Sequence, residues 1–179
     1  MSEHPPDGID VRASGPGDLA AIQAIYAKNV LTGLGSFEEA PPDTAEMARR
    51  RAAVIDLGLP WLVAERNGRV LGYCYAHPYH TRSAYRFTLE DAIYIDPEAR
   101  RGGIGRALLG ALLDETACLG YRHMIAVIGD SGNAGSIALH ARAGFRMVGT
   151  LEAVGFKFGR WVDVVLMQRD LSPQARAEA

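Results

Sequence analysis

The stretch Arg100-Arg101-Gly102-Gly103-Ile104-Gly105-Arg106-Ala107 decides the fold of this chain. A strand-like apolar run at 92–95 precedes it, and a helix-like apolar run at 107–113 follows it. Glycine lets a backbone approach an anion closely, and the free N–H groups and dipole of a helix N-terminus favour negative charge. Three glycines among three arginines therefore predict a cradle for a phosphate group between a strand and a helix.

The spacing of this loop, Arg-x-x-Gly-x-Gly, excludes two common nucleotide loops. No Lys-Ser/Thr pair follows the glycines, as a Walker-type loop requires. No acidic ribose ligand lies at the distance that a dinucleotide fingerprint needs. The alternative is a glycine-rich turn that only packs a strand against a helix, but packing does not call for three arginines.

Composition indicates one soluble globular domain. The chain has 179 residues, of which 48% are hydrophobic and 22% charged. We expect a single domain over residues 9–171 and flexible tails at 1–8 and 172–179. The net charge of −2, with no basic run, argues against nucleic acid as a partner.

No apolar run is long enough for a membrane span, and the polar N-terminal stretch does not resemble a signal peptide. A cytoplasmic location is therefore expected. Cys74 and Cys118 match no metal or redox spacing, so we expect reduced, buried thiols and no metal site.

Hydrophobic periodicity and turn residues predict a mixed order of elements. Asp43-x-x-Glu46 predicts a capping box, Asn67-Gly68 predicts a two-residue hairpin turn, and the unbroken apolar run at 124–128 indicates a strand covered on both faces. The predicted strands are 9–13, 61–65, 69–76, 87–95, 124–128, 145–156 and 160–168, and the predicted helices are 19–30, 43–57, 104–119 and 133–143. This order indicates an α+β (mixed α/β) fold, a mostly antiparallel sheet with helices on both faces.

The glycine loop in this setting resembles the acetyl-CoA pyrophosphate loop of the GNAT superfamily of N-acetyltransferases. The segment from Asn133 to His140, followed by Ala143-Gly144-Phe145, is similar to the segment that follows in that family. Three more segments resemble the phosphinothricin and methionine sulfoximine acetyltransferase branch, and the resemblance extends over about residues 9–171. These segments are Leu31-Thr32-Gly33 leading to Phe37-Glu38-Glu39, Tyr85-Arg86-Phe87-Thr88-Leu89-Glu90, and Gly155-Phe156-Lys157-Phe158-Gly159-Arg160-Trp161-Val162-Asp163.

The resemblance implies a GNAT-type fold, in which a splayed strand pair of the central sheet holds acetyl-CoA as the acetyl donor. It also implies a homodimer that acts on a small-molecule amine. The cofactor-binding residues that it implies are Ala92, Ile93 and Ile95 through their main chain, Arg100, Arg101, Gly102, Gly103, Ile104, Gly105 and Arg106 in the loop, and Asn133 and Ser136. Asn133 is also a candidate helix N-cap, and the two roles are compatible.

Glu90 and His140 are the catalytic candidates. Glu90 alternates with Thr88 and Ala92, and the resemblance places it as the general base, acting through a water. The alternative is a solvated strand carboxylate. The resemblance places His140 near the thiol, where an imidazolium donates to the leaving thiolate or anchors the cofactor. The alternative is a helix histidine satisfied by a neighbouring backbone group.

The acceptor side needs groups that bind acidic oxygens. Arg82 and Arg86 lie on either side of Tyr85, and an arginine fork suits carboxylate, phosphinate or sulfoximine oxygens. The alternative is a pair of surface arginines. The resemblance adds Phe37 as a pocket wall and Thr88 beside the base, so the predicted acceptor residues are Phe37, Arg82, Tyr85, Arg86 and Thr88.

One acceptor segment, His77-Pro78-Tyr79-His80-Thr81-Arg82, departs from the version common in the branch. Its two histidines have no carboxylate or cysteine partner at metal-ligand spacing, so no metal site is predicted there.

Together these observations predict an enzyme that moves an acetyl group from acetyl-CoA to the α-amine of a phosphinothricin- or methionine sulfoximine-like amino acid analogue by direct transfer. One alternative is a protein or peptide N-acetyltransferase, which calls for an open acidic groove. Another is a non-catalytic acyl-CoA-binding sensor. The presence of both Glu90 and His140 argues against a sensor, because binding alone needs neither.

Overall fold

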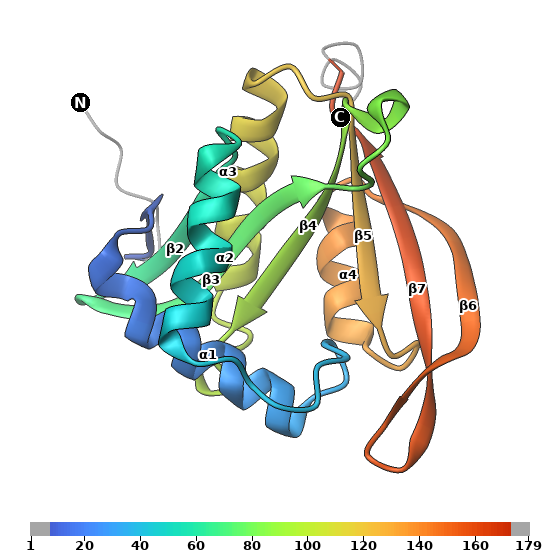
Figure 1. The fold of residues 1–179 in the computed structure, drawn as a ribbon, viewed down its shortest axis with the longest axis horizontal. Helices are drawn as coiled ribbons and strands as arrows, with labels where there is room; N and C mark the ends of the chain where they lie inside the picture. Colours follow the sequence, from blue (N-terminus) through green and yellow to red (C-terminus); the bar gives the residue numbers. More distant parts are fainter. Residues whose placement is uncertain (1–7, 173–179) are drawn as a thin grey trace.

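The structure, a computed structural model, describes residues 8–172, and a seven-stranded sheet with the order β1-β2-β3-β4-β5-β7-β6 forms its centre (Figure 1). The strands are β1 Asp10–Ala13, β2 Trp61–Arg66, β3 Arg69–Pro78, β4 Thr88–Ile95, β5 His123–Gly129, β6 Arg146–Lys157 and β7 Arg160–Asp170. Neighbouring strands are antiparallel except β4 and β5, which are parallel. The prediction of a mostly antiparallel sheet is confirmed.

Four α-helices cover the two faces of the sheet: α1 Leu19–Thr32, α2 Thr44–Asp56, α3 Ile104–Cys118 and α4 Ala134–Arg142. Figure 1 shows α1 and α2 together on one face and α3 on the other. The strand alternation explains this, since Tyr94 of β4 meets Tyr26 of α1 at 4.8 Å between ring centroids, whereas Cys74 of β3 donates from Sγ to the Leu108 carbonyl of α3. Each face of β3 and β4 is thus buried against a different helical layer.

The turns and caps follow the sequence signals closely. Asn67 and Gly68 adopt φ angles of 53° and 74°, as a two-residue hairpin turn between β2 and β3 requires. Asp43 accepts a hydrogen bond from the Glu46 amide at 2.7 Å and begins α2. The capping box is only half formed, because the Glu46 carboxylate pairs with Arg49 and Arg50 instead of reaching back to the N-cap.

Two expectations about burial were wrong. The Val127 side chain of β5 is 38% exposed, because it lines the cleft that opens where β4 leaves β5. Cys118 is exposed at the last residue of α3, whereas Cys74 is buried as expected. Ser172 is buried and donates its amide to Asp170. The remaining residues of the predicted tails, 1–7 and 173–179, lie outside the described residues.

Within residues 8–172, none of the helices is long and apolar enough to cross a membrane.

Candidate active site

The parallel strands β4 and β5 part in the middle of the sheet (Figure 1). Their ladder ends at the pair Asp91–Ala126, although β4 continues to Ile95 and β5 to Gly129. A cleft of about 1620 Å³ opens beyond this fork, lined by residues 92–95 of β4 and 126–129 of β5. The predicted splayed strand pair is therefore confirmed, and the main chain of Ala92, Ile93 and Ile95 lies along the cleft with no β5 partner.

The glycine loop closes one end of this cleft. Gly103 is the N-cap of α3, with a left-handed φ of 81° that favours glycine. The Ala107 amide makes a hydrogen bond to the Gly103 carbonyl, which leaves the amides of Ile104 and Gly105 without an intrahelical partner at the cleft. These amides lie beside Arg100, Arg101 and Arg106 in the cleft lining, an arrangement that suits an anion.

Gly105 has a second role that the sequence did not reveal. A Cβ atom at this position would lie 3.1 Å from Leu139 of α4, so the glycine allows the N-terminus of α3 to approach α4 closely. The two helices therefore lie on the same face of the sheet, under the cleft.

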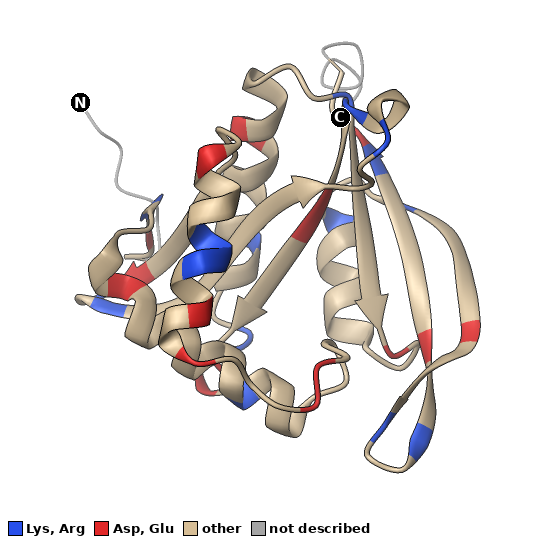
Figure 2. Ribbon diagram, viewed as in Figure 1, with Lys and Arg blue, Asp and Glu red and all other residues tan. Residues whose placement is uncertain are grey.

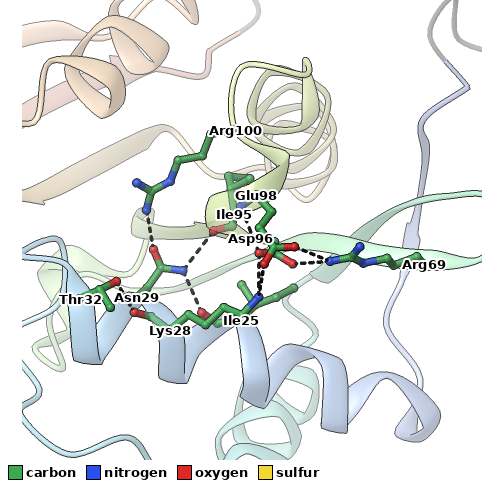
Figure 3. Close-up of polar contacts among 9 residues, drawn as sticks. All are labelled: Ile25, Lys28, Asn29, Thr32, Arg69, Ile95, Asp96, Glu98 and Arg100. Carbon is green, nitrogen blue, oxygen red and sulfur yellow. Dashed lines mark hydrogen bonds and ion pairs between the residues drawn. The ribbon is translucent and has the colours of Figure 1, made fainter.

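Asn29 of α1 fastens the loop to the end of β4 (Figure 3). Its Nδ2 donates to the carbonyls of Ile25 and Ile95, and its Oδ1 accepts from Arg100 at 3.1 Å. Asn29 could not be predicted from the sequence, because a single polar residue on a partly exposed helix belongs to no recognisable motif. One side chain thus links α1, the splayed strand and the glycine loop.

Next to it, Asp96 is buried and caps the turn that leads into the loop (Figure 3). It accepts from Lys28 at 3.1 Å, from Arg69 at 3.0 Å and from the Glu98 amide at 3.2 Å. Although burial alone would raise the pKa of Asp96, these bonds hold it below its ordinary value. The start of the glycine loop is therefore fixed by an ionised aspartate.

Glu90 lies at the fork, in the short acidic stretch part-way along β4 (Figure 2). Its side chain is 25% exposed and lines the cleft on the face opposite Asp91. Burial raises the pKa of Glu90 above its ordinary value; His77 and His80 lower it, and the charge of Asp91 raises it further. A half-buried carboxyl with a raised pKa suits a general base that works near neutral pH.

His140 is held in the protein interior by an aspartate that sequence reasoning missed. Its Nε2 lies 3.0 Å from Oδ2 of Asp91, its Nδ1 lies 2.8 Å from the Ser136 carbonyl, and both side chains of the pair are 2% exposed. Burial alone would lower the pKa of His140, but the hydrogen bond and charge of Asp91 and the Ser136 carbonyl raise it. Both ring nitrogens thus face acceptors inside the protein, which favours the protonated ring.

One feature of the sequence does indicate a buried role for Asp91. It occupies an otherwise apolar series of alternating residues, Leu89, Ile93 and Ile95, that faces the helical layer. A carboxylate in such a series needs a buried partner, and the histidine of α4 provides it.

Asn133 and Ser136 line the cleft at the start of α4. The Asn133 side chain accepts from the Ser136 amide at 3.2 Å, so the predicted N-cap is present.

The loop after α1 forms the opposite wall of the cleft through residues 33–36. Phe37 is next, and its ring lies directly over Gly155 of β6, where a Cβ atom would be 2.2 Å from Cε2. The buried Lys157 donates from Nζ to the Ser36 carbonyl at 2.6 Å. Gly155 and Lys157 thus hold this loop in place. The sequence does not indicate this role, because it depends on β6 lying beside the loop.

The predicted acceptor residues, Phe37 included, lie outside the cleft lining. Figure 2 shows that basic residues gather around segment 79–87, at the end of the sheet where β4 begins. There Arg86 donates to the Ser83 carbonyl and stacks over Phe87 at 4.7 Å. Arg82, Tyr85 and Thr88 are likewise absent from the cleft wall, where Tyr75 and His77 of β3 lie beside Glu90.

Within residues 8–172, no group of three or more His, Cys, Asp or Glu side chains is arranged to hold a metal ion.

The family model described as "Acetyltransferase (GNAT) family" matches residues 23–145. The chain belongs to the GNAT acetyltransferase family. A phosphinothricin N-acetyltransferase of Alcaligenes faecalis is 57% identical over 162 residues, which cover 90% of this chain and 82% of the relative. An L-methionine sulfoximine/L-methionine sulfone acetyltransferase of Salmonella typhimurium is 37% identical over 171 residues, 96% of this chain and 99% of the relative.

A solved GNAT structure superposes closely on this chain. It is a phosphinothricin acetyltransferase from Sinorhizobium meliloti in complex with AcCoA, 46% identical, with a TM-score of 0.89 and coverage of 92% of this chain and 89% of that one. The predicted fold class and the predicted GNAT branch are therefore confirmed.

Proposed function

We propose that this GNAT enzyme transfers the acetyl group of acetyl-CoA to the α-amine of an amino acid analogue of the phosphinothricin or methionine sulfoximine type. The printed activities of the two relatives support this acceptor class. The observation that carries the proposal is Glu90, a half-buried carboxyl at the fork of the cleft that ends in the anion cradle.

The residues of the cleft fit acetyl-CoA. The amides of Ile104 and Gly105, with the nearby arginines, suit a pyrophosphate, and the unpaired edge of β4 suits the amide groups of a pantetheine. Asn133 and Ser136 lie where the cleft passes over α4. When bound, acetyl-CoA supplies a thioester carbonyl that an amine can attack.

We propose that Glu90 is the general base, because an amino acid carries an ammonium group at neutral pH and must lose a proton before it attacks. The raised pKa of Glu90 makes its carboxylate a stronger acceptor of that proton than an ordinary glutamate. We propose that the acetyl group then passes directly from the thioester to this amine.

We propose that His140 acts as a positioning residue. Both of its ring nitrogens are bonded to Asp91 and Ser136. The pair fixes α4 against β4 below the fork, and so fixes the residues of α4 that line the cleft.

Recognition of the acceptor by Arg82 and Arg86 stays a prediction, because both lie outside the cleft lining. The test is the KM of the acceptor in Arg82→Ala and Arg86→Ala, which rises with an unchanged KM for acetyl-CoA if the arginines bind acidic oxygens of the substrate.

The test of the proposed activity is a thiol-release assay with acetyl-CoA and a panel of amines. Phosphinothricin and methionine sulfoximine are expected to release CoA, and mass spectrometry of the product is expected to show one acetyl group on the α-amine. Release only with peptides would support a protein N-acetyltransferase. No release with any amine, together with tight acetyl-CoA binding, would support a sensor.

The homodimer is also a proposal, supported by an apolar surface on β6 and β7. Its exposed side chains are Met147, Val148, Leu151, Val154, Phe156, Phe158 and Trp161. A monomer seldom exposes so many large apolar groups on one hairpin. Sedimentation of the wild type and of Trp161→Glu tests it, and a monomeric wild type would contradict it.

A further inference from the structure

His77 lies directly across from Glu90 in the β3–β4 ladder. Its Nε2 is 3.8 Å from Oε1 of Glu90, and both residues line the cleft. The imidazole is the more exposed of the two, at 36% against 25% for the carboxyl. His77 is therefore the partner of the pair with the greater access to solvent.

The hydrogen bond on the other side of the ring fixes its tautomer. Nδ1 of His77 lies 3.1 Å from the Pro78 carbonyl, which only accepts, so Nδ1 carries a hydrogen. Nε2 is then the ring nitrogen that can accept a further proton, and it is the one that faces Glu90.

The other titratable groups near Glu90 are placed differently. Asp91 is next on β4 but points to the opposite face, and β5 puts the uncharged Ile125 opposite Glu90. Tyr75 lies two residues before the imidazole on β3, and His80 follows β3 and acts on Glu90 only through space. His77 of β3 is thus the group placed to exchange a proton with Glu90.

A base that takes one proton in each turnover must also lose it. Acetylation of an ammonium group forms a C–N bond, breaks the C–S bond and removes two protons from nitrogen. One of them ends on the thiol sulfur and the other in solvent. The carboxylate of Glu90 is ready again only after its proton has left.

We propose that His77 is the proton relay of this site, taking the substrate's proton from Glu90 at Nε2 and releasing it to solvent. The proposal rests on the proposed function, with Glu90 as the base. His77 acts through Glu90 and touches no reacting atom, so it is a positioning and relay residue.

The experiment compares the wild type with His77→Ala, His77→Gln, His77→Lys and the control His80→Ala, using acetyl-CoA and phosphinothricin. We expect His77→Ala and His77→Gln to lower kcat by about 10-fold or more, with the KM for acetyl-CoA unchanged. Added imidazole should restore kcat in His77→Ala with saturation, because the vacated position is open to solvent. His80→Ala should keep the wild-type kcat.

The pH profile separates a relay from a simple charge effect. The protonated form of His77 lowers the pKa of Glu90, and glutamine carries no charge, so the ascending limb of kcat/KM moves to higher pH in His77→Gln. His77→Lys keeps the charge and returns the limb toward its wild-type position, but kcat stays low, because a lysine does not release protons near neutral pH.

A wild-type kcat in His77→Gln, restoration of kcat by His77→Lys, or no rescue by imidazole would overturn the relay. These outcomes presuppose an active wild type. If the wild type itself releases no thiol, the proposed function fails instead, so the two failures are distinguishable.

Discussion

Replacement of Asp91 by alanine is the perturbation whose effect follows most directly from the structure. Asp91 and His140 form a buried ion pair of 3.0 Å between β4 and α4, and both side chains are 2% exposed. The alanine removes the charge that balances the imidazolium and leaves a buried ring nitrogen without its acceptor. Helix α4, which is capped by Asn133 and contains Ser136, then loses its ion pair to β4.

The size of the effect follows from the burial. Removing one partner of a buried ion pair costs about 3–5 kcal/mol. For a domain of this length, each kcal/mol lowers Tm by about 2–4 °C, so Asp91→Ala is expected to lower Tm by about 6–20 °C. Asp91→Asn keeps the shape and one hydrogen bond, and we expect it to cost about 1.5–3 kcal/mol.

The assay is urea unfolding of the wild type and both variants between pH 5.5 and 9. Because Asp91 raises the folded-state pKa of His140, the stabilisation is fully present below the unfolded pKa of about 6.5 and is lost as pH rises through the folded value. The gap between the wild type and Asp91→Asn should therefore be widest at low pH.

A gap that does not change with pH, or an Asp91→Ala variant within about 0.5 kcal/mol of the wild type, would refute the reasoning. In addition, the KM for acetyl-CoA should rise in Asp91→Asn. An unchanged value would mean that the pair stabilises the fold without shaping the cleft.

Three further substitutions test the walls of the cleft. Gly155→Ala places a Cβ atom 2.2 Å from the Phe37 ring and should raise the KM of the acceptor but not that of acetyl-CoA, measured by initial rates. Asn29→Ala loses the bonds to β4 and Arg100 and should raise the KM for acetyl-CoA by about 5-fold, since a net hydrogen bond contributes about 1 kcal/mol. Gly103→Ala, at a φ of 81°, should cost about 1–2 kcal/mol in unfolding and weaken acetyl-CoA binding by calorimetry.

Matched glycines serve as controls. Gly149 of β6 and Gly110 of α3 have nothing within 4 Å of an added Cβ atom. Gly149→Ala should therefore leave the acceptor KM unchanged, and Gly110→Ala should leave unfolding unchanged or slightly stabilise the helix. Equal effects in test and control would contradict the assigned contacts.

Much of the fold could be predicted because local signals determine it. The turn at Asn67-Gly68, the cap at Asp43 and the glycine N-terminus of α3 each depend on a backbone conformation that few residues adopt. The open face of β5 could not be predicted, because an apolar run looks the same whether a neighbouring strand stays beside it or diverges. The exposure of Val127 results from the path of β4.

Features of the site that depend on the local sequence could be predicted. Features that depend on pairing across the sheet could not. The face of β4 that carries Glu90 and the glycine at the start of α3 follow from strand alternation and loop composition. The partners Asp91 and His77 come from register and helix packing, which single residues do not signal. The same limit applies to Arg82, whose sequence proximity to Glu90 does not bring it to the cleft.

The central claim is that Glu90 is the base that takes the proton from the acceptor amine. The measurement that tests it most directly is the pH dependence of kcat/KM for the wild type and Glu90→Gln, with phosphinothricin and saturating acetyl-CoA. The account predicts a wild-type ascending limb above the pKa of an ordinary glutamate, and a variant that lacks this limb and is slower by about 10²- to 10⁴-fold. A Glu90→Gln variant that keeps both the limb and the rate would contradict it.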